Sequence, residues 1–351
     1  MNHHAVVLAL ISAALFGVST PAAKLLLGTI DPAVLAGLLY CGAGIGVGLL
    51  RHVTRYAFPN AGLAEAPLQR HDLPWLAGAI AAGGVAGPVL LMAGLSRTDA
   101  STASLLLTLE GVATALLAWF VFRESFDRRI AVGMAFLVSG AIVLAWSGGP
   151  SASSLLGPLL IVGACLAWGI DNNLTRKVSL ADPLQIVQIK GLVAGPVNLL
   201  LGLVIGSSLT TLSASVIAGI VGFIGYGISL ALFVRALRYL GTARTGAYFS
   251  TAPFLGAVVS VMFLSEPLTL QLAAAGALMA VGVWLHVTEV HEHEHEHQPM
   301  EHEHLHVHDE HHQHEHSADD LPGEPHSHPH RHKRLSHTHP HVPDMHHTHG
   351  H

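Results

Sequence analysis

Long apolar segments recur along the whole chain and are separated by short connections that contain glycine, proline or charged residues. A helix needs about 20 mostly apolar residues to cross a bilayer. Ten segments meet this requirement and predict ten transmembrane helices. Their expected ranges are 5–27, 33–50, 74–95, 100–122, 130–147, 154–175, 184–205, 214–236, 243–264 and 269–288.

Composition supports the same interpretation. The chain is 51% hydrophobic and only 11% charged, whereas soluble domains carry about 25% charged residues. The formal charge of −6 is unevenly divided, because residues 1–288 are net positive and residues 289–351 are strongly acidic and rich in histidine. The sequence therefore predicts a membrane body joined to an unlike tail, and it argues against a soluble enzyme.

The Lys and Arg residues between the spans predict the orientation. If the N-terminus is cytoplasmic, the inner loops hold eleven Lys and Arg residues, and the outer loops and span ends hold only Lys24 and Arg97. Positive residues concentrate on the cytoplasmic side of membrane proteins. We therefore expect a multi-pass protein of the cytoplasmic (inner) membrane with both termini in the cytoplasm.

The two halves of the membrane body resemble each other in sequence. Glu124 in the stretch FRES aligns with Glu266 in FLSEP, and the Phe-Gly pair that ends at Gly17 aligns with the Trp-Gly pair that ends at Gly169. Each half contains five spans, and because five is odd the second half must insert upside down. Inverted repeats of this kind are typical of secondary transporters, whose substrate site lies between the repeats.

The ten spans, their five-plus-five inverted repeat, and the repeated Gly and Glu positions resemble the drug/metabolite transporter superfamily, specifically its EamA family. The resemblance covers roughly residues 5–288 and implies an all-α integral membrane protein. It also implies a central cavity formed by the first four spans of each half, and movement of a small solute, often outward. We expect a first repeat over 1–148, a second over 149–288, and a disordered His-rich tail over 289–351.

Glu110 is an ionisable residue near the middle of the fourth predicted span, with no basic residue within a helical turn. Charged groups inside a membrane are costly and are functional candidates for that reason. Because desolvation favours the neutral form of a carboxyl group, such a residue can bind and release protons. The alternative is a protonated structural Glu that bonds a neighbouring helix.

Asp171 and Lys190 lie at similar depths in the hairpin formed by the sixth and seventh predicted spans, so an ion pair between them is expected. Such a pair either stabilises the hairpin or is opened by substrate or a proton. Asn172 and Asn173 extend the polar run, but successive helical residues turn by about 100°, so the three side chains cannot all face one cavity unless the helix is surrounded by others or locally irregular.

Polar positions in the first half correspond to this run. Ser19 and Thr20 align with Asp171 and Asn172, and polar residues at matching places in two repeats indicate a transporter site. Asn198, which follows Gly195-Pro196, adds an amide to the seventh span, unless the proline only kinks the helix. These residues, with Glu110, Asn173 and Lys190, form the predicted substrate and proton pathway.

The tail holds 23 of the 28 histidines of the chain and almost no apolar residues, so it cannot form a hydrophobic core. Neutral imidazole is a good ligand for Zn²⁺, Ni²⁺ and Co²⁺, and we expect several labile sites rather than one fixed site. A pH-responsive tail is the alternative. The candidate metal ligands are His291, His293, His295, His297, His302, His304, His306, His308, His311, His312, His314 and His316.

The leading hypothesis from the sequence is a secondary transporter that exports a small solute, coupled to protons, with no enzymatic activity and no required cofactor. One alternative is a transition-metal efflux carrier for nickel, cobalt or zinc, and another is a membrane-anchored metal storage or sensor protein. The expected partners are a small-molecule substrate, protons and the lipid bilayer, with no nucleic acid. A homodimer remains open.

Overall fold

The structure is a computed structural model of the full chain. It describes residues 3–57, 67–122, 128–146, 152–178, 181–233, 235–236, 248–287, 291–297, 301–306, 326–331 and 335–341.

The membrane body consists of helices. Eight of them are long and apolar enough to cross a membrane, and they correspond to the first eight predicted spans. Two shorter apolar helices, Ala252–Phe263 and Leu270–Leu285, lie within the last two predicted spans. The ninth span was expected to begin at residue 243, and its first residues lie outside the described part. The all-α membrane fold is therefore confirmed.

The first half contains five spans, of which the third and fourth consist of several helical segments. Its elements are α1 (His3–Leu26), α2 (Pro32–Ala57), the 3₁₀-helix η1 (Arg70–Asp72), α3 (Leu73–Ala79), the π-helix η2 (Ile80–Ala86), α4 (Gly87–Leu95), α5 (Ala100–Leu106), α6 (Leu109–Phe122) and α7 (Arg128–Ala145).

The second half repeats this order. Its elements are α8 (Ala152–Arg176), α9 (Pro183–Val204), α10 (Leu212–Gly222), the π-helix η3 (Phe223–Ile228), α12 (Ala252–Phe263) and α13 (Leu270–Val287).

The second span of each half begins directly after an aspartate that precedes a proline. Asp182 precedes Pro183 and its Oδ1 accepts hydrogen bonds from the backbone amides of Leu184 and Gln185, which caps α9. Proline suits the first helical position because its missing N–H would lack a helical partner there. The equivalent Asp31 precedes α2, but its Oδ2 accepts from the amide of Ser208 instead. The repeated Asp-Pro pair thus marks a helix start in both halves.

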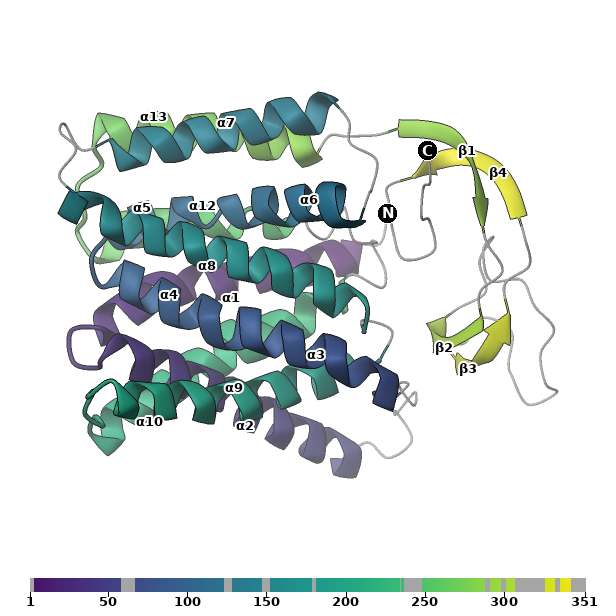
Figure 1. Ribbon diagram of the computed structural model, residues 1–351, viewed down its shortest axis with the longest axis horizontal. Helices are drawn as coiled ribbons and strands as arrows, with labels where there is room; N and C mark the ends of the chain where they lie inside the picture. The colour runs from purple at the N-terminus through teal and green to yellow at the C-terminus, as the bar shows by residue number, and fades with distance from the viewer. Residues whose placement is uncertain are drawn as a thin grey trace.

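Equivalent helices of the two halves pack against each other. Helix α2 contacts α9 and α7 contacts α13, and the equivalent fourth spans meet where α5 contacts α12. In the same way α8 packs on α6 of the first half, and α1 packs on α12 of the second. The pair α7 and α13 lies at one edge of the bundle, and α2, α9 and α10 lie at the opposite edge (Figure 1). This reciprocal pattern is what two inverted repeats produce.

The contact between α2 and α9 depends on small residues. A Cβ atom at Gly44 would lie 2.6 Å from the backbone nitrogen of Leu192, and one at Gly191 would collide with the backbone of Gly44. In lipid there is no hydrophobic drive between helices, so close backbone approach supplies much of the packing. These glycines therefore allow the backbones of α2 and α9, and with them the two halves, to pack closely.

Irregular segments also recur at matching positions. The third span of each half contains a π-helix, η2 in the first and η3 in the second. The fourth span of the first half is interrupted at Leu107–Thr108, between α5 and α6, and that of the second half at residues 250–251, before α12. At both interruptions a threonine Oγ1 donates to the carbonyl three residues earlier: Thr108 to Leu105 and Thr251 to Tyr248.

Four short strands form in the tail. Strand β1 (His291–His297) pairs antiparallel with β4 (Leu335–His341), and β2 (Glu301–His306) with β3 (His326–Arg331) (Figure 1). The structure differs here from the expected tail without regular structure. Antiparallel pairing satisfies backbone N–H and C=O groups without an apolar core, so a polar repeat can form local ribbons.

Candidate functional site

The ion pair expected in the hairpin of α8 and α9 is present. Lys190 Nζ lies 2.6 Å from Asp171 Oδ1 and 2.7 Å from Oδ2, and both side chains are buried. Thr175 Oγ1 donates to Asp171 Oδ1 at 2.8 Å and accepts from Lys190 at 3.3 Å. The carboxylate and the ammonium group are therefore neutralised and hydrogen-bonded by residues of their own hairpin.

The π-helix η2 lies directly against this pair. A Cβ atom at Gly83 would overlap the carboxylate of Asp171, so only glycine fits at this position. The Gly83 carbonyl accepts hydrogen bonds from Tyr40 Oη at 2.7 Å and from Trp168 Nε1 at 3.0 Å. A π-helix frees carbonyl groups from the regular helical pattern, and here side chains of α2 and α8 satisfy one of them.

Asn198 provides a hydrogen-bond donor for a second backbone carbonyl of η2. Its Nδ2 donates to the carbonyl of Gly84 at 2.9 Å, and the residue is fully buried. Its Oδ1 has no hydrogen-bond partner among the described residues. Asn198 therefore links α9 to the backbone of the third span and stabilises the contact between them.

Glu110 lies in the first turn of α6, immediately after the interruption of the fourth span. Its Oε1 accepts a hydrogen bond from Asn172 Nδ2 at 2.8 Å, and the same amide group lies 3.2 Å from Thr114 Oγ1. Thr114 Oγ1 in turn donates to the backbone carbonyl of Glu110 at 2.8 Å. A carboxyl, an amide and a hydroxyl from two helices therefore form one polar cluster.

The three consecutive polar residues of α8 point in three directions. Asp171 reaches Lys190 of α9, and Asn173 Nδ2 donates to the carbonyls of Gly169 and Thr114. Both of these residues are buried, whereas Asn172 is exposed. Only Asn172 therefore combines an accessible side chain with a contact to Glu110.

Ser19 and Thr20 do not join this cluster. Both are buried, and Ser19 Oγ donates to the carbonyl of Phe16 in its own helix at 2.6 Å. A Cβ atom at Gly225 of η3 would lie 2.5 Å from the Cβ of Ser19. The first-half counterparts of the polar run thus pack α1 against the π-helix of the second half.

A cluster of aromatic rings lies between the halves, and single sequence motifs do not reveal it. The ring centroid of Phe16 lies 6.4 Å from that of Trp168, 5.7 Å from that of Tyr226 and 5.3 Å from that of Phe249. Phe233 lies 4.8 Å from Phe249. The repeated Phe-Gly and Trp-Gly pairs were the available signal, because Phe16 and Trp168 are the two matching aromatic residues and they meet here.

The glycines of these two pairs explain how the rings approach. A Cβ atom at Gly17 would collide with the backbone of Ala252 at the start of α12, and one at Gly169 would lie 2.9 Å from the Cβ of Ala113 in α6. Each glycine therefore allows the first helix of one half to contact the fourth span of the other. These close contacts place the preceding aromatic residue between the halves.

Glu266 caps a helix of the first half. Its two carboxylate oxygens accept hydrogen bonds from the backbone amides of Ala100 and Ser101, at 2.7 and 2.8 Å, at the start of α5. A carboxylate is favourable at a helix N-terminus because of the helix dipole. Its counterpart Glu124 lies outside the described residues.

The candidate metal ligands of the tail divide into two groups. His291, His293, His295 and His297 are in β1, and His302, His304 and His306 are in β2. His308, His311, His312, His314 and His316 lie outside the described residues.

The strand register opposes histidines to histidines. In the pairing of β1 with β4, His291, His293 and His295 are opposite His341, His339 and His337. In the pairing of β2 with β3, His302, His304 and His306 are opposite His330, His328 and His326.

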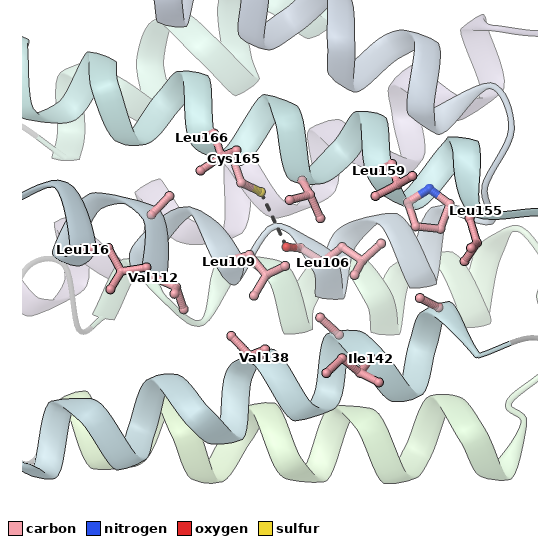
Figure 2. A pocket seen from close by; sticks show the side chains of 15 residues that line it. Leu106, Leu109, Val112, Leu116, Val138, Ile142, Leu155, Leu159, Cys165 and Leu166 are labelled. Atoms are coloured by element: carbon pink, nitrogen blue, oxygen red, sulfur yellow. Dashed lines mark hydrogen bonds between the residues drawn. The ribbon is translucent and has the colours of Figure 1, made fainter. Parts of the chain in front are cut away.

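A separate apolar cavity of about 340 Å³ lies between α5, α6, α7 and α8. Its lining is almost entirely aliphatic, and Cys165 Sγ donates to the carbonyl of Leu106 at 3.6 Å inside it (Figure 2). Ile142 and Leu159 in its wall are exposed, as residues that face lipid would be. The polar cluster of Glu110 and Asn172 does not line this cavity.

Two inverted five-span halves, with interrupted helices at matching positions, are the architecture of a membrane transporter. The sequence pattern of the EamA-like transporter family matches the chain twice, over residues 3–146 and 155–288. The chain therefore belongs to the EamA-like transporter family. The two matches also agree with the two repeats expected from the sequence.

Individual relatives agree with this assignment. A protein of Methanothermobacter thermautotrophicus described as an uncharacterized transporter is 28% identical over 283 residues, which cover 77% of this chain and 82% of that protein. The uncharacterized transporter YvbV of Bacillus subtilis is 27% identical over 202 residues, which cover 55% of this chain and 64% of that protein. A protein of known crystal structure is similar to 80% of this chain and 95% of its own, with a TM-score of 0.59 at 18% identity, which supports the fold alone.

Proposed function

We propose that the protein is a proton-coupled secondary transporter that exports a small solute, with Glu110 as the proton-binding group. The observation that carries this proposal is the position of Glu110 at the interruption of the fourth span, hydrogen-bonded to the exposed Asn172. Interrupted helices at matching places in two repeats mark the binding region of secondary transporters.

The charges around the site favour Glu110 over Asp171 as the proton carrier. Asp171 is held by Lys190 in a buried pair. Among the described residues no cation lies within ion-pair distance of Glu110, which is only partly buried. A carboxyl group without a counter-ion in a membrane exchanges protons more readily than one paired with an ammonium group.

Alternating access follows from the repeat. The π-helices η2 and η3 and the interruptions at Thr108 and Thr251 occupy equivalent places. An equilibrium between two conformations in which the halves exchange roles would expose Glu110 to each side in turn. The excess of Lys and Arg in the loops on one side supports an inner-membrane protein with both termini in the cytoplasm. In this proposal solute moves outward in exchange for inward protons.

The tail is proposed as a metal-binding appendage for zinc, nickel or cobalt. The register places His291, His293 and His295 opposite histidines of β4 and supports this, because it brings potential ligands from two strands together in one ribbon. A metal-binding tail is also compatible with two other functions: transition-metal efflux, and metal storage or sensing by a membrane-anchored protein.

Transport assays in proteoliposomes test the leading proposal. Vesicles loaded with a pH-sensitive dye would be supplied with single metabolites under an imposed pH gradient, and a transported solute would produce a proton flux. Glu110→Gln is expected to abolish that flux while the protein remains folded. If Glu110→Gln transports at the rate of the unaltered protein, Glu110 is not the coupling residue.

The metal functions are tested in cells. A deletion strain would be compared with a strain that lacks only residues 289–351, and both would be assayed for sensitivity to zinc, nickel and cobalt and for their metal content. Metal accumulation in the deletion strain would favour efflux, and lowered metal content in both strains would favour storage by the tail. Unchanged content in both would exclude metal as the cargo.

A further inference from the structure

We propose that the apolar cavity between α5, α6, α7 and α8 is a binding site for one hydrocarbon chain of a membrane lipid (Figure 2). The lipid lies in the leaflet beside α7 and α8, and one of its chains enters between these two helices. The inference needs only the membrane fold and not the proposed transport, so either can fail without the other.

The cavity has a buried floor and an exposed rim. The floor contains Leu106, Val112 and Cys165, each of which is at most 6% exposed. The rim contains Ile142 of α7 and Leu159 of α8, which are 57% and 62% exposed. The medium around a spanning helix is hydrocarbon and not water. The cavity therefore opens sideways into the bilayer, and its floor lies inside the protein.

The packing of the neighbouring helices explains the opening. Helix α7 packs mainly on α13 of the other half, and α8 packs mainly on α4 and α6. The labelled side chains of α7 and α8 lie on either side of those of α5 and α6 (Figure 2). Because α7 and α8 each have their main partners elsewhere, the space between them is left to lipid.

The dimensions of the cavity fit one chain. Its lining extends from Leu155 to Leu166 of α8, which is about 16 Å along the helix axis. A volume of about 340 Å³ over this length leaves a mean cross-section of about 20 Å². One extended hydrocarbon chain has this girth, whereas a fused ring system is wider. The long axis follows the helices, which is also the direction of lipid chains in a bilayer.

The lining selects a hydrocarbon chain and not a polar headgroup. Of the described residues that line the cavity, none has a charged or amide side chain. The thiol of Cys165 already donates to the carbonyl of Leu106. An aliphatic cavity of this kind stays dry, and its walls lose dispersion contacts if nothing fills it. Lipid chains surround the rim at high concentration, so a weak preference is enough for occupancy.

A bound chain would contact the interruption of the fourth span. Leu106 ends α5 and Leu109 begins α6, and both residues line the cavity. The amide of Glu110 bonds the carbonyl of Leu107, three residues earlier, and the carbonyl of Leu106 accepts from the thiol of Cys165. The chain therefore packs against both helical ends and stabilises the interrupted form of the span.

Photolabelling in vesicles tests the proposal. The purified full-length protein is reconstituted into phosphatidylcholine vesicles in which a small fraction of the lipid carries a diazirine on one acyl chain. Light expels N₂ from the diazirine, and the resulting carbene inserts into a neighbouring C–H bond that mass spectrometry of the fragments locates. We expect label on the floor residues Leu106 and Val112 as well as on the rim. Leu35 and Leu91, which are equally buried and do not line the cavity, are expected to stay unlabelled.

Variants that fill the cavity provide the matched comparison. Ala141→Phe adds a ring to the wall formed by α7, and it is expected to lose most of the label on the floor and to retain the label on the rim. Val132→Phe is the control, because Val132 is exposed on the same helix and does not line the cavity. Ala145→Phe is a second filling variant of the same wall and replaces Ala141→Phe if that variant does not fold.

Three results would overturn the proposal. Label confined to the rim residues Ile142 and Leu159 would show that lipid surrounds the helices without entering. Equal floor label in Ala141→Phe and Val132→Phe would show that the reagent reaches the floor by another route. Absence of label from both floor and rim, together with a dimer in the same vesicles, would assign the opening to contact with a second copy of the chain.

Discussion

The buried ion pair makes a quantitative prediction. In Lys190→Met the ammonium group is lost, and Asp171 keeps only the hydroxyl of Thr175 as a partner. Removal of one member of a buried pair leaves an uncompensated charge and costs about 3–5 kcal/mol. The cost is at the upper end of this range if the site stays dry, because both side chains are buried and the Lys190 ammonium bonds both carboxylate oxygens.

The double variant separates charge from packing. Asp171→Asn combined with Lys190→Met removes both charges and keeps the side chains close to their original size. Replacement of a whole buried pair by neutral groups is often nearly neutral for stability. The double variant is therefore expected to be more stable than Lys190→Met alone and to recover most of the lost free energy of unfolding.

Unfolding in mixed detergent micelles measures both changes. The free energy of unfolding of the unaltered protein, of each single variant and of the double variant completes a double-mutant cycle. A loss of less than about 1 kcal/mol in Lys190→Met would refute the reasoning, because that is the range of exposed pairs. A transport assay on the double variant tests the role of the pair: restored transport indicates a bracing role, and folded but inactive protein indicates that the pair takes part in transport.

Three further predictions concern other contacts. Gly83→Ala is expected to destabilise the protein by about 1–3 kcal/mol, because the added methyl group overlaps the carboxylate of Asp171. Gly111→Ala is the control, because a Cβ atom added there meets no neighbouring atom outside its own helix within 4 Å. Equal melting temperatures of the two variants would contradict the prediction. Glu266→Gln is expected to lower stability by about 1 kcal/mol, because an amide has one acceptor oxygen for the two backbone amides that the carboxylate caps; thermal unfolding measures this, and no change would show that the cap adds nothing. Removal of residues 289–351 is expected to abolish binding of several zinc or nickel ions per chain, measured by elemental analysis after dialysis, and to leave the melting temperature of the body unchanged; retained metal would locate the sites in the body.

Much of the fold could be predicted because the lipid environment restricts it. A spanning helix must form its own backbone hydrogen bonds and expose apolar side chains to lipid. Its length and composition can therefore be recognised in the sequence. The odd number of spans per repeat then requires inversion. The tenth predicted span agrees with α13 to within one residue at each end, and the first residues of the ninth lie outside the described part.

The candidate site could be predicted only in part. The ion pair of Asp171 and Lys190 followed from the hairpin, because residues at equal distances from a turn lie at equal depth. The bond from Asn172 to Glu110 joins residues 62 positions apart, and periodicity within one helix contains no information about it. Ser19 was expected near the site from the repeat alone, but it bonds its own helix instead.

By itself, the sequence determined the membrane class, the spans, the repeat and the one buried pair that a single hairpin can form. The tertiary structure decided which residue of the polar run is accessible, how the carbonyls of η2 are satisfied, and which aromatic rings meet. The physical reason is that these contacts form between helices from different halves, where glycines such as Gly17 and Gly169 set the approach of the backbones. Helix periodicity specifies a face, and only packing specifies what that face meets.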